Sequence, residues 1–140
     1  MYYKMKNEIN TAHAANAFTL MKLTFGIVPI VAGLDKFTNL LTQWDQYLNP
    51  SIEAMLPLSP HAFMMVVGVI EIIAGLLVLR SPGIGGIIVA AWLAVIAVTL
   101  LLSGQFLDVA VRDLVMAVGA YSMARMAVPA PAKKFYESHA

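Results

Sequence analysis

Four stretches of the chain are apolar for long enough to cross a membrane as helices. They run over residues 17–35, 61–79, 84–102 and 106–128, and the third of them carries no charged residue. A spanning helix needs about 20 predominantly apolar residues because the hydrocarbon core of a bilayer is about 30 Å thick. The pattern therefore predicts an all-α integral membrane protein folded as a four-helix bundle.

Turn-forming residues separate these stretches. A Ser-Pro pair at 59–60 precedes the second stretch, where serine suits the cap and proline the first turn of a helix. Ser-Pro-Gly at 81–83 and Ser-Gly at 103–104 separate the remaining stretches. Because these last two links are short, we expect the second, third and fourth helices to be antiparallel neighbours.

The segment between the first two stretches, residues 36–60, is amphipathic. Its apolar side chains recur every three or four residues, opposite Asn and Gln, and they include Phe37, Leu40, Leu41, Trp44, Tyr47 and Leu48. This spacing predicts one or two amphipathic helices that lie in the membrane interface or cover the bundle. The aromatic side chains favour an interfacial anchor, since such residues gather at headgroup level, and a functional lid is the alternative.

Basic residues predict the orientation of the bundle. Of the flanking basic residues, Lys36 falls clearly on one side, whereas the other side holds Lys4, Lys6, Arg80, Lys133 and Lys134. By the positive-inside rule, the N-terminal segment 1–16 and the C-terminal tail 129–140 are expected in the cytoplasm. The amphipathic segment 36–60 is then extracytoplasmic.

The first two stretches share a pattern of small residues. Gly26 and Gly33 in the first occupy the same places in it as Gly68 and Gly75 in the second. Glycines seven residues apart lie on nearly one face of a helix and let helix backbones approach closely. We expect these glycines to form a helix-packing face and do not take them as a sign of gene duplication.

The composition excludes several classes of function. Only 12% of the 140 residues are charged, the net charge is +1, and the chain contains no cysteine. Soluble domains carry roughly 25% charged residues, so an ordinary soluble enzyme and a nucleic-acid-binding protein are excluded. Without cysteine there is no disulfide chemistry, iron–sulfur cluster or thiolate-ligated zinc. The three histidines, at 13, 61 and 139, are too dispersed to hold a haem or a zinc ion.

Several charged residues fall inside the predicted spans. Charged groups there cost about 2.5–3.5 kcal/mol each and normally face the protein interior and pair. By helical rise Glu71 lies about 15 Å from the outer surface, and Lys22 or Arg112 is within its reach if the helix faces agree. Asp108 and Arg112 are spaced i,i+4 and can pair on one helix. The full candidate cluster is Lys22, Glu71, Asp108, Arg112 and Asp113.

Two interpretations of this cluster remain open. In the first, it is a network of ion pairs that fixes the rotation of the helices. In the second, Glu71 with Arg112 or Lys22 lines a polar cavity for a quinone headgroup, a proton or a small anion, and Asp113 supports Arg112.

Short motifs in three of the spans resemble those of the DoxX-like family. The run from Gly33 to Lys36 and Phe37 resembles its Gly-x-x-Lys-Phe/Leu element, and the run from Glu71 through Gly75 resembles its Glu-x-x-x-Gly-x-x-Leu block. The fourth span, with Arg112, Asp113 and Gly119, is similar to its closing helix. The resemblance covers roughly residues 17–128 and implies a four-helix protein of a bacterial or archaeal cytoplasmic membrane.

The resemblance also implies a link to electron transfer. Some DoxX-like proteins look like subunits of quinone-linked oxidoreductases, thiosulfate:quinone oxidoreductase among them. We therefore expect an accessory subunit that is not catalytic on its own, with a quinone as its cofactor. Its expected partners are the lipid bilayer and an oxidoreductase subunit or further copies of itself. The alternatives are a small-molecule or proton-coupled carrier and a structural scaffold of a larger membrane complex.

Overall fold

The computed structural model describes residues 1–127, and in that part of the chain every regular element is a helix. The elements are α1 (Tyr2–Asp35), η1 (Trp44–Tyr47), α2 (Pro50–Glu53), α3 (Pro60–Arg80), α4 (Pro82–Ser103) and α5 (Leu107–Ala127). The predicted all-α class is thus confirmed for the described residues. Residue 128 and the predicted tail 129–140, with Lys133 and Lys134, lie outside them.

Three of the long helices, α1, α3 and α4, are long and apolar enough to cross a membrane. The fourth, α5, has 21 residues but carries Asp108, Arg112, Asp113 and Arg125, which makes it more polar than the other three. A membrane protein of helical type follows from the three apolar helices.

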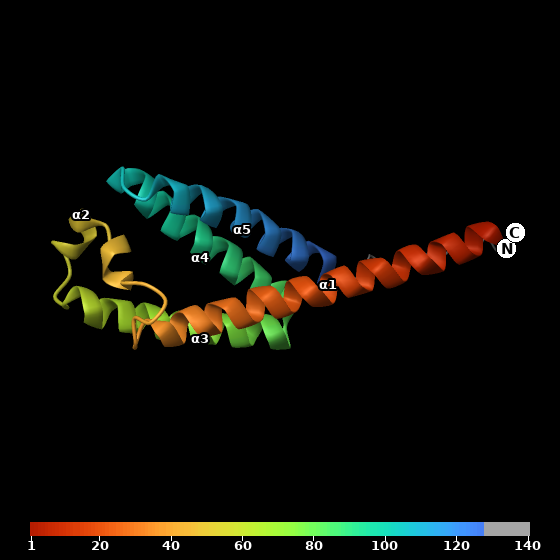
Figure 1. Cartoon of the computed structure of the whole chain (residues 1–140), viewed down its shortest axis with the longest axis horizontal. Helices are drawn as coiled ribbons and strands as arrows, with labels where there is room; N and C mark the ends of the chain where they lie inside the picture. Colours follow the sequence, from red (N-terminus) through yellow and green to blue (C-terminus); the bar gives the residue numbers. More distant parts are fainter. Residues whose placement is uncertain (128–140) are drawn as a thin grey trace, which may run out of the picture.

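The helix ends follow the turn-forming residues. The Ser59 side chain accepts a hydrogen bond from the backbone N–H of Ala62, and Pro60 occupies the first turn of α3. Helix α4 likewise begins with a proline. It ends at Ser103 and is followed by Gly104, whose positive φ of 69° suits a residue without a side chain. α1 is longer than the predicted first span. It begins at Tyr2, because no helix-breaking residue precedes the span, and residues 2–16 continue as an exposed helix beyond the bundle (Figure 1).

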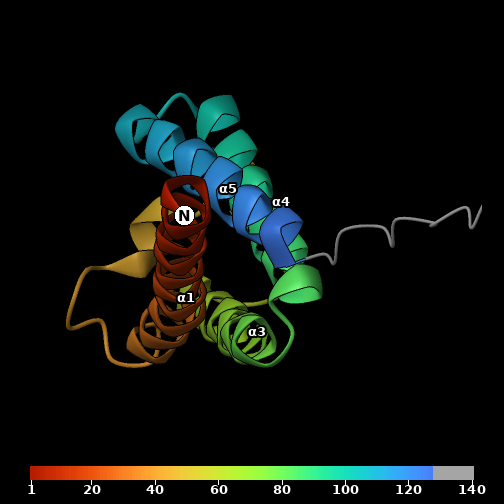
Figure 2. The same cartoon turned by 90° about the vertical axis from the view of Figure 1, so that its right-hand side faces the viewer.

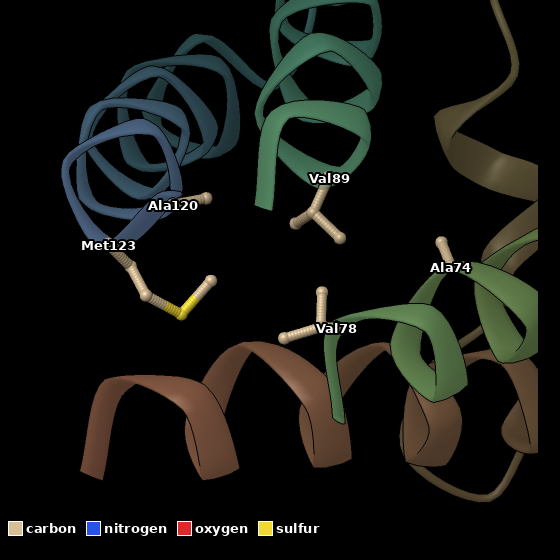
Figure 3. Packing of buried hydrophobic residues seen from close by; sticks show 5 residues of the cluster. All are labelled: Ala74, Val78, Val89, Ala120 and Met123. Carbon is tan, nitrogen blue, oxygen red and sulfur yellow. The ribbon is translucent and has the colours of Figure 1, made fainter. Parts of the chain in front are cut away.

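The long helices form two antiparallel pairs, α1 with α3 and α4 with α5 (Figures 1 and 2). The turn at 80–82 joins the pairs, and near that turn they pack on each other through a small apolar core (Figure 3). The core consists of Ala74, Val78, Val89, Ala120 and Met123. Farther from the turn the pairs separate, and residues 36–59 lie between them (Figure 1).

The shared glycines pack α1 against α3, as expected. A Cβ atom added to Gly33 would lie 2.5 Å from the carbonyl oxygen of Gly68, and one added to Gly75 would overlap the carbonyl oxygen of Gly26. The backbones are therefore in direct contact at two levels, which are about two helical turns apart. Because the helices are antiparallel, Gly33 faces Gly68 and Gly26 faces Gly75, the reverse of their order in the aligned sequences.

The connecting segment, residues 36–59, is less helical than its spacing predicts. Only the four-residue elements η1 and α2 form, and Asn39 adopts a positive φ of 52°. The Asp35 carboxylate accepts hydrogen bonds from the backbone N–H groups of Leu40 and Leu41, which bends the chain away from a helical path. The prediction of one or two amphipathic helices in residues 36–60 was thus wrong in their length, since only two four-residue elements form.

The apolar side chains of the connecting segment turn into the bundle. Leu48 is buried against Met64 and Val67 of α3, with Trp44 and Trp92 packed on the same cluster. The Asn49 side chain donates to the carbonyl oxygen of Thr99 in α4. The segment therefore lies between the two helix pairs and covers the wider end of the bundle.

Candidate functional site

A buried ion pair between α1 and α3 is the main polar feature of the interior. The Lys36 Nζ lies 2.6 Å from the Glu71 Oε2, and 4% and 10% of the two side chains are exposed. Glu71 is 11 residues after the start of α3, about 16 Å along the helix from that end, and so lies deep in the bundle. A cation and a carboxylate stabilise each other at this depth, because burial of either one alone would strongly destabilise the fold.

The packing of α1 on α3 explains why these two residues meet. Helical side chains tilt toward the N-terminus of their own helix. In an antiparallel pair, Lys36 and Glu71 therefore tilt toward each other, although Lys36 follows the last residue of α1. Gly68 leaves room for the lysine, since a Cβ atom on that glycine would lie 3.2 Å from the Lys36 Cβ.

Two tryptophans surround the ion pair. The Trp92 indole N–H of α4 is directed at the Glu71 Oε1 at 3.4 Å, and the Lys36 ammonium lies 3.6 Å from the centre of the Trp44 ring. A cation over an indole face gains electrostatic stabilisation from the ring quadrupole. The ion pair between α1 and α3 is thus also in contact with the connecting segment, through Trp44, and with α4, through Trp92.

Asp35 fixes the position of Trp44. Its carboxylate accepts from the Trp44 indole N–H at 2.8 Å, from the Thr38 hydroxyl at 2.9 Å, and from two backbone N–H groups of the connecting segment. Asp35 is itself buried, with 6% of its surface exposed. Adjacent residues therefore have different tasks: Asp35 holds the segment in place and Lys36 extends into the bundle.

A cavity of about 670 Å³ opens beside the ion pair. We call it the central cavity. Most of its lining is apolar, from Phe25 and Ala32 in α1 to Leu93 and Ile96 in α4. The polar part consists of Lys36, Glu71, Asp113, Arg112, Thr24, Thr42, Thr99, Asn49 and the ring-bearing side chains Trp44, Tyr47 and Trp92. A largely apolar space with a few convergent polar groups has the features of a small-molecule site.

Only part of the cluster predicted from the sequence comes together. Glu71 and Asp113 both line the central cavity and are both buried, with 8% of each residue exposed. Arg112 instead pairs with Asp108 at 2.7 Å, as its i,i+4 spacing predicts. That pair is exposed, so Asp113 does not support Arg112 in a pair with Glu71.

Lys22 lies apart from the site. It is half-buried, does not line the central cavity, and forms no ion pair with other residues of the range 1–127. Side chains 14 residues apart on α1 are separated by about 21 Å, and Lys36 rather than Lys22 is on the level of Glu71. The sequence-based interpretation thus assigned the wrong partners, Lys22 or Arg112, to Glu71. It placed Lys36, the observed partner, outside the bundle.

The glycines of the family-like motifs are contact points between helices. Gly33 and Gly75 lie in the α1–α3 contact, and a Cβ atom on Gly119 of α5 would lie 2.9 Å from the Phe25 ring of α1. Trp92 is not among the site residues predicted from the sequence, and its side chain turns inward to the central cavity. The signal that would have identified it is its place halfway along an uncharged helix, on the level of Glu71.

The arrangement can bind a molecule that has an apolar body and a polar end. The ammonium of Lys36 and the indole N–H of Trp92 are hydrogen-bond donors, and Asp113 offers a carboxyl without a protein partner among the described residues. Within residues 1–127, no group of three or more His, Asp or Glu side chains gathers as metal ligands would. Comparison of the chain with protein-family models, with curated proteins and with solved structures finds no match.

Proposed function

We propose that this protein is a four-span integral membrane protein of the DoxX-like type that binds a quinone in the central cavity. In this proposal it serves a quinone-linked oxidoreductase as an accessory subunit in a bacterial or archaeal cytoplasmic membrane. The observation that carries the proposal is the buried Lys36–Glu71 pair at the edge of a mainly apolar cavity. A quinone has an apolar tail and ring, and its carbonyl oxygens accept hydrogen bonds from groups such as an ammonium or an indole N–H.

The size of the cavity supports this ligand class. Its volume of about 670 Å³ lies in the range of about 300–1,000 Å³ that is typical of small-molecule pockets. The two tryptophans and Tyr47 add flat aromatic surface next to the polar groups. A ring can pack on such side chains while its oxygens reach Lys36.

The exposed side chains of α5 support its role as the fourth span. Asp113 faces the interior, and Asp108 pairs with Arg112 within the first turns, so that these charges are either inside the bundle or near one end. The outer face of the helix is apolar and consists of Val111, Leu114, Val115 and Val118. The same kind of surface covers α3 and α4, and contiguous apolar surface of this extent suits contact with lipid.

The proposed topology places both termini in the cytoplasm. Lys36 is the flanking basic residue on the predicted extracytoplasmic side, where the positive-inside rule disfavours positive charge. Its side chain is buried against Glu71, so it adds no exposed positive charge to that end of the bundle. Arg80 and Arg125 lie in the last turns of α3 and α5, at the other end of the bundle, and both are exposed. The difference in exposed basic residues between the two ends therefore supports a cytoplasmic side at the turn between α3 and α4.

Tryptophan fluorescence tests quinone binding directly. Trp44 and Trp92 are the two tryptophans of the chain, and both line the central cavity. A short-chain benzoquinone added to the purified protein in phospholipid vesicles should quench their emission, and the quenching should reach saturation at a low quinone concentration. Quenching that rises linearly without saturation would mean that the quinone only partitions into the lipid, and it would refute the proposal.

A matched pair of variants on α1 locates the binding site. Ala32 lines the cavity, whereas its neighbour Val31 is exposed and does not. Ala32→Leu fills part of the cavity and should weaken saturable quenching, while Val31→Leu should leave it unchanged. Equal effects of the two variants would place the quinone elsewhere.

The accessory role needs a separate experiment. The protein, extracted from its native membrane in a mild detergent, should retain an oxidoreductase subunit and a stoichiometric quinone, which mass spectrometry identifies. A preparation that contains phospholipid alone would refute the accessory role.

A further inference from the structure

Within residues 1–127, Asp113 is a buried carboxyl without a protein partner. Only 8% of the residue is exposed, and its side chain lines the central cavity. Among the described residues, no side chain forms an ion pair or a hydrogen bond with it, and the neighbouring Arg112 is engaged with Asp108. Buried polar groups in proteins nearly always have a partner, so this carboxyl calls for an explanation.

The charges around the cavity leave no cation for Asp113. The titratable side chains that line the cavity are Lys36, Tyr47, Glu71, Arg112 and Asp113. Lys36 contacts Glu71 at 2.6 Å, and the Arg112 guanidinium is 2.7 Å from Asp108 with 69% of its side chain exposed. Helix α4 contributes no titratable side chain at all. An ionised Asp113 would therefore be a second buried negative charge beside a single, already paired ammonium.

A buried carboxyl in such surroundings avoids the cost of desolvation by keeping its proton. A protonated carboxyl is a hydrogen-bond donor, whereas an ionised one only accepts. We propose that Asp113 carries a proton at neutral pH and donates it in a hydrogen bond to a carbonyl oxygen of the molecule in the central cavity. Lys36 and Glu71 keep their contact with each other. The assignment of the proton rests on the cavity alone, and the identity of the acceptor rests on the proposed function.

This assignment divides the polar groups of the cavity into two kinds. The ion pair is a fixed arrangement of charge between α1 and α3, held by the contacts with both tryptophans. Asp113, on α5, is a neutral donor that can exchange its proton without breaking a contact in the protein. The site then favours a neutral ligand with an acceptor oxygen, because an anionic ligand would lie next to Glu71.

Labelling with the hydrophobic reagent dicyclohexylcarbodiimide tests the proton on Asp113. This reagent modifies protonated carboxyl groups in apolar surroundings, and peptide mass spectrometry locates the adduct. In the full chain in vesicles at neutral pH, we expect an adduct on Asp113 and none on Glu71. Asp113→Asn should lose the adduct. Lys36→Met should add one on Glu71, which shows that the reagent reaches the cavity.

A second measurement does not depend on whether the reagent can reach Asp113. The infrared band of a protonated carboxylic acid should be present in the wild type at neutral pH and absent in Asp113→Asn. An adduct on Glu71 in the wild type would overturn the proposal. Absence of both the Asp113 adduct and the infrared difference would also overturn it.

Addition of a short-chain benzoquinone separates the two parts of the proposal. If Asp113 donates to the ligand, saturating quinone should strongly slow its modification. If fluorescence shows saturable quinone binding and the rate of modification does not change, Asp113 is not the donor. If no quinone binds but Asp113 is still modified, the proposed function fails while the protonated carboxyl stands.

Discussion

Gly33 and Gly68 are in backbone contact, and this contact sets Lys36 opposite Glu71. A Cβ atom on either glycine would lie 2.5 Å from the carbonyl oxygen of the other. Each charged residue lies three positions after its glycine, on antiparallel helices whose side chains tilt toward each other. The position of the ion pair thus follows from the closest approach of α1 and α3.

Alanine at Gly68 should destabilise the protein and disturb the ion pair. The added methyl group would meet both the Gly33 carbonyl oxygen and the Lys36 Cβ, so α1 and α3 must separate. Overpacking of this kind costs about 1–3 kcal/mol. We expect a lower midpoint of chemical unfolding in detergent micelles and weaker quinone quenching of tryptophan fluorescence.

Gly83→Ala is the control for this substitution. A Cβ atom there has the Ala127 Cβ as its nearest neighbour, at an ordinary 3.8 Å. The unfolding midpoint should stay the same or rise slightly, since alanine favours a helix over glycine. Equal losses in Gly68→Ala and Gly83→Ala would show that the tight contact is not what makes Gly68 necessary.

The ion pair itself should behave as a coupled unit. Lys36→Met leaves a buried carboxylate and Glu71→Gln leaves a buried ammonium, and each loss should cost about 3–5 kcal/mol of unfolding free energy. The double variant removes both charges and should recover most of that loss. Additive effects of the two substitutions in a double-mutant cycle would contradict a direct interaction.

The sequence was sufficient to predict the four apolar helical stretches but not the extension of α1 to Tyr2, nor how the helices contact one another. Prolines 60 and 82 and Gly104 mark ends that local backbone chemistry determines, and these ends agree with the structure. The shared glycines were recognised as a packing face, yet aligning the two stretches in parallel matched Gly33 with Gly75. The antiparallel register matches Gly33 with Gly68, and this register reveals Lys36 as the partner of Glu71.

The polar residues show the same limit. Lys36 follows the end of an apolar stretch, so hydropathy alone puts it in water, and only the three-dimensional packing shows that the connecting segment covers it. The pairing of Arg112 with Asp108 was predictable because it is local to one turn of α5. The bend at Asp35 was not, since it depends on the hydrogen bonds of one carboxylate with a segment whose spacing suggests a helix.

Asp35→Ala should loosen the connecting segment while the helices stay folded. The substitution removes the acceptor for the backbone N–H groups of Leu40 and Leu41 and for the Trp44 indole. Hydrogen exchange measured by mass spectrometry should become faster in residues 38–48 and stay unchanged in α4. Asp108→Asn is the matched control, because its partner is an exposed arginine and not the segment. Unchanged exchange in residues 38–48 would mean that the apolar contacts of Leu48 alone hold the segment.

The orientation of the bundle can be tested with single cysteines, since the chain has none of its own. Met55 in the connecting segment is 84% exposed and Met5 in the free part of α1 is 49% exposed, so cysteine fits both places. The positive-inside rule puts the end with Arg80 and Arg125 in the cytoplasm. A maleimide that cannot cross membranes should therefore label Met55→Cys in intact cells. It should label Met5→Cys only after the membrane is opened. Labelling of Met5→Cys alone in intact cells would invert the topology. Labelling of both in intact cells would contradict the single crossing by α1 that separates the two positions.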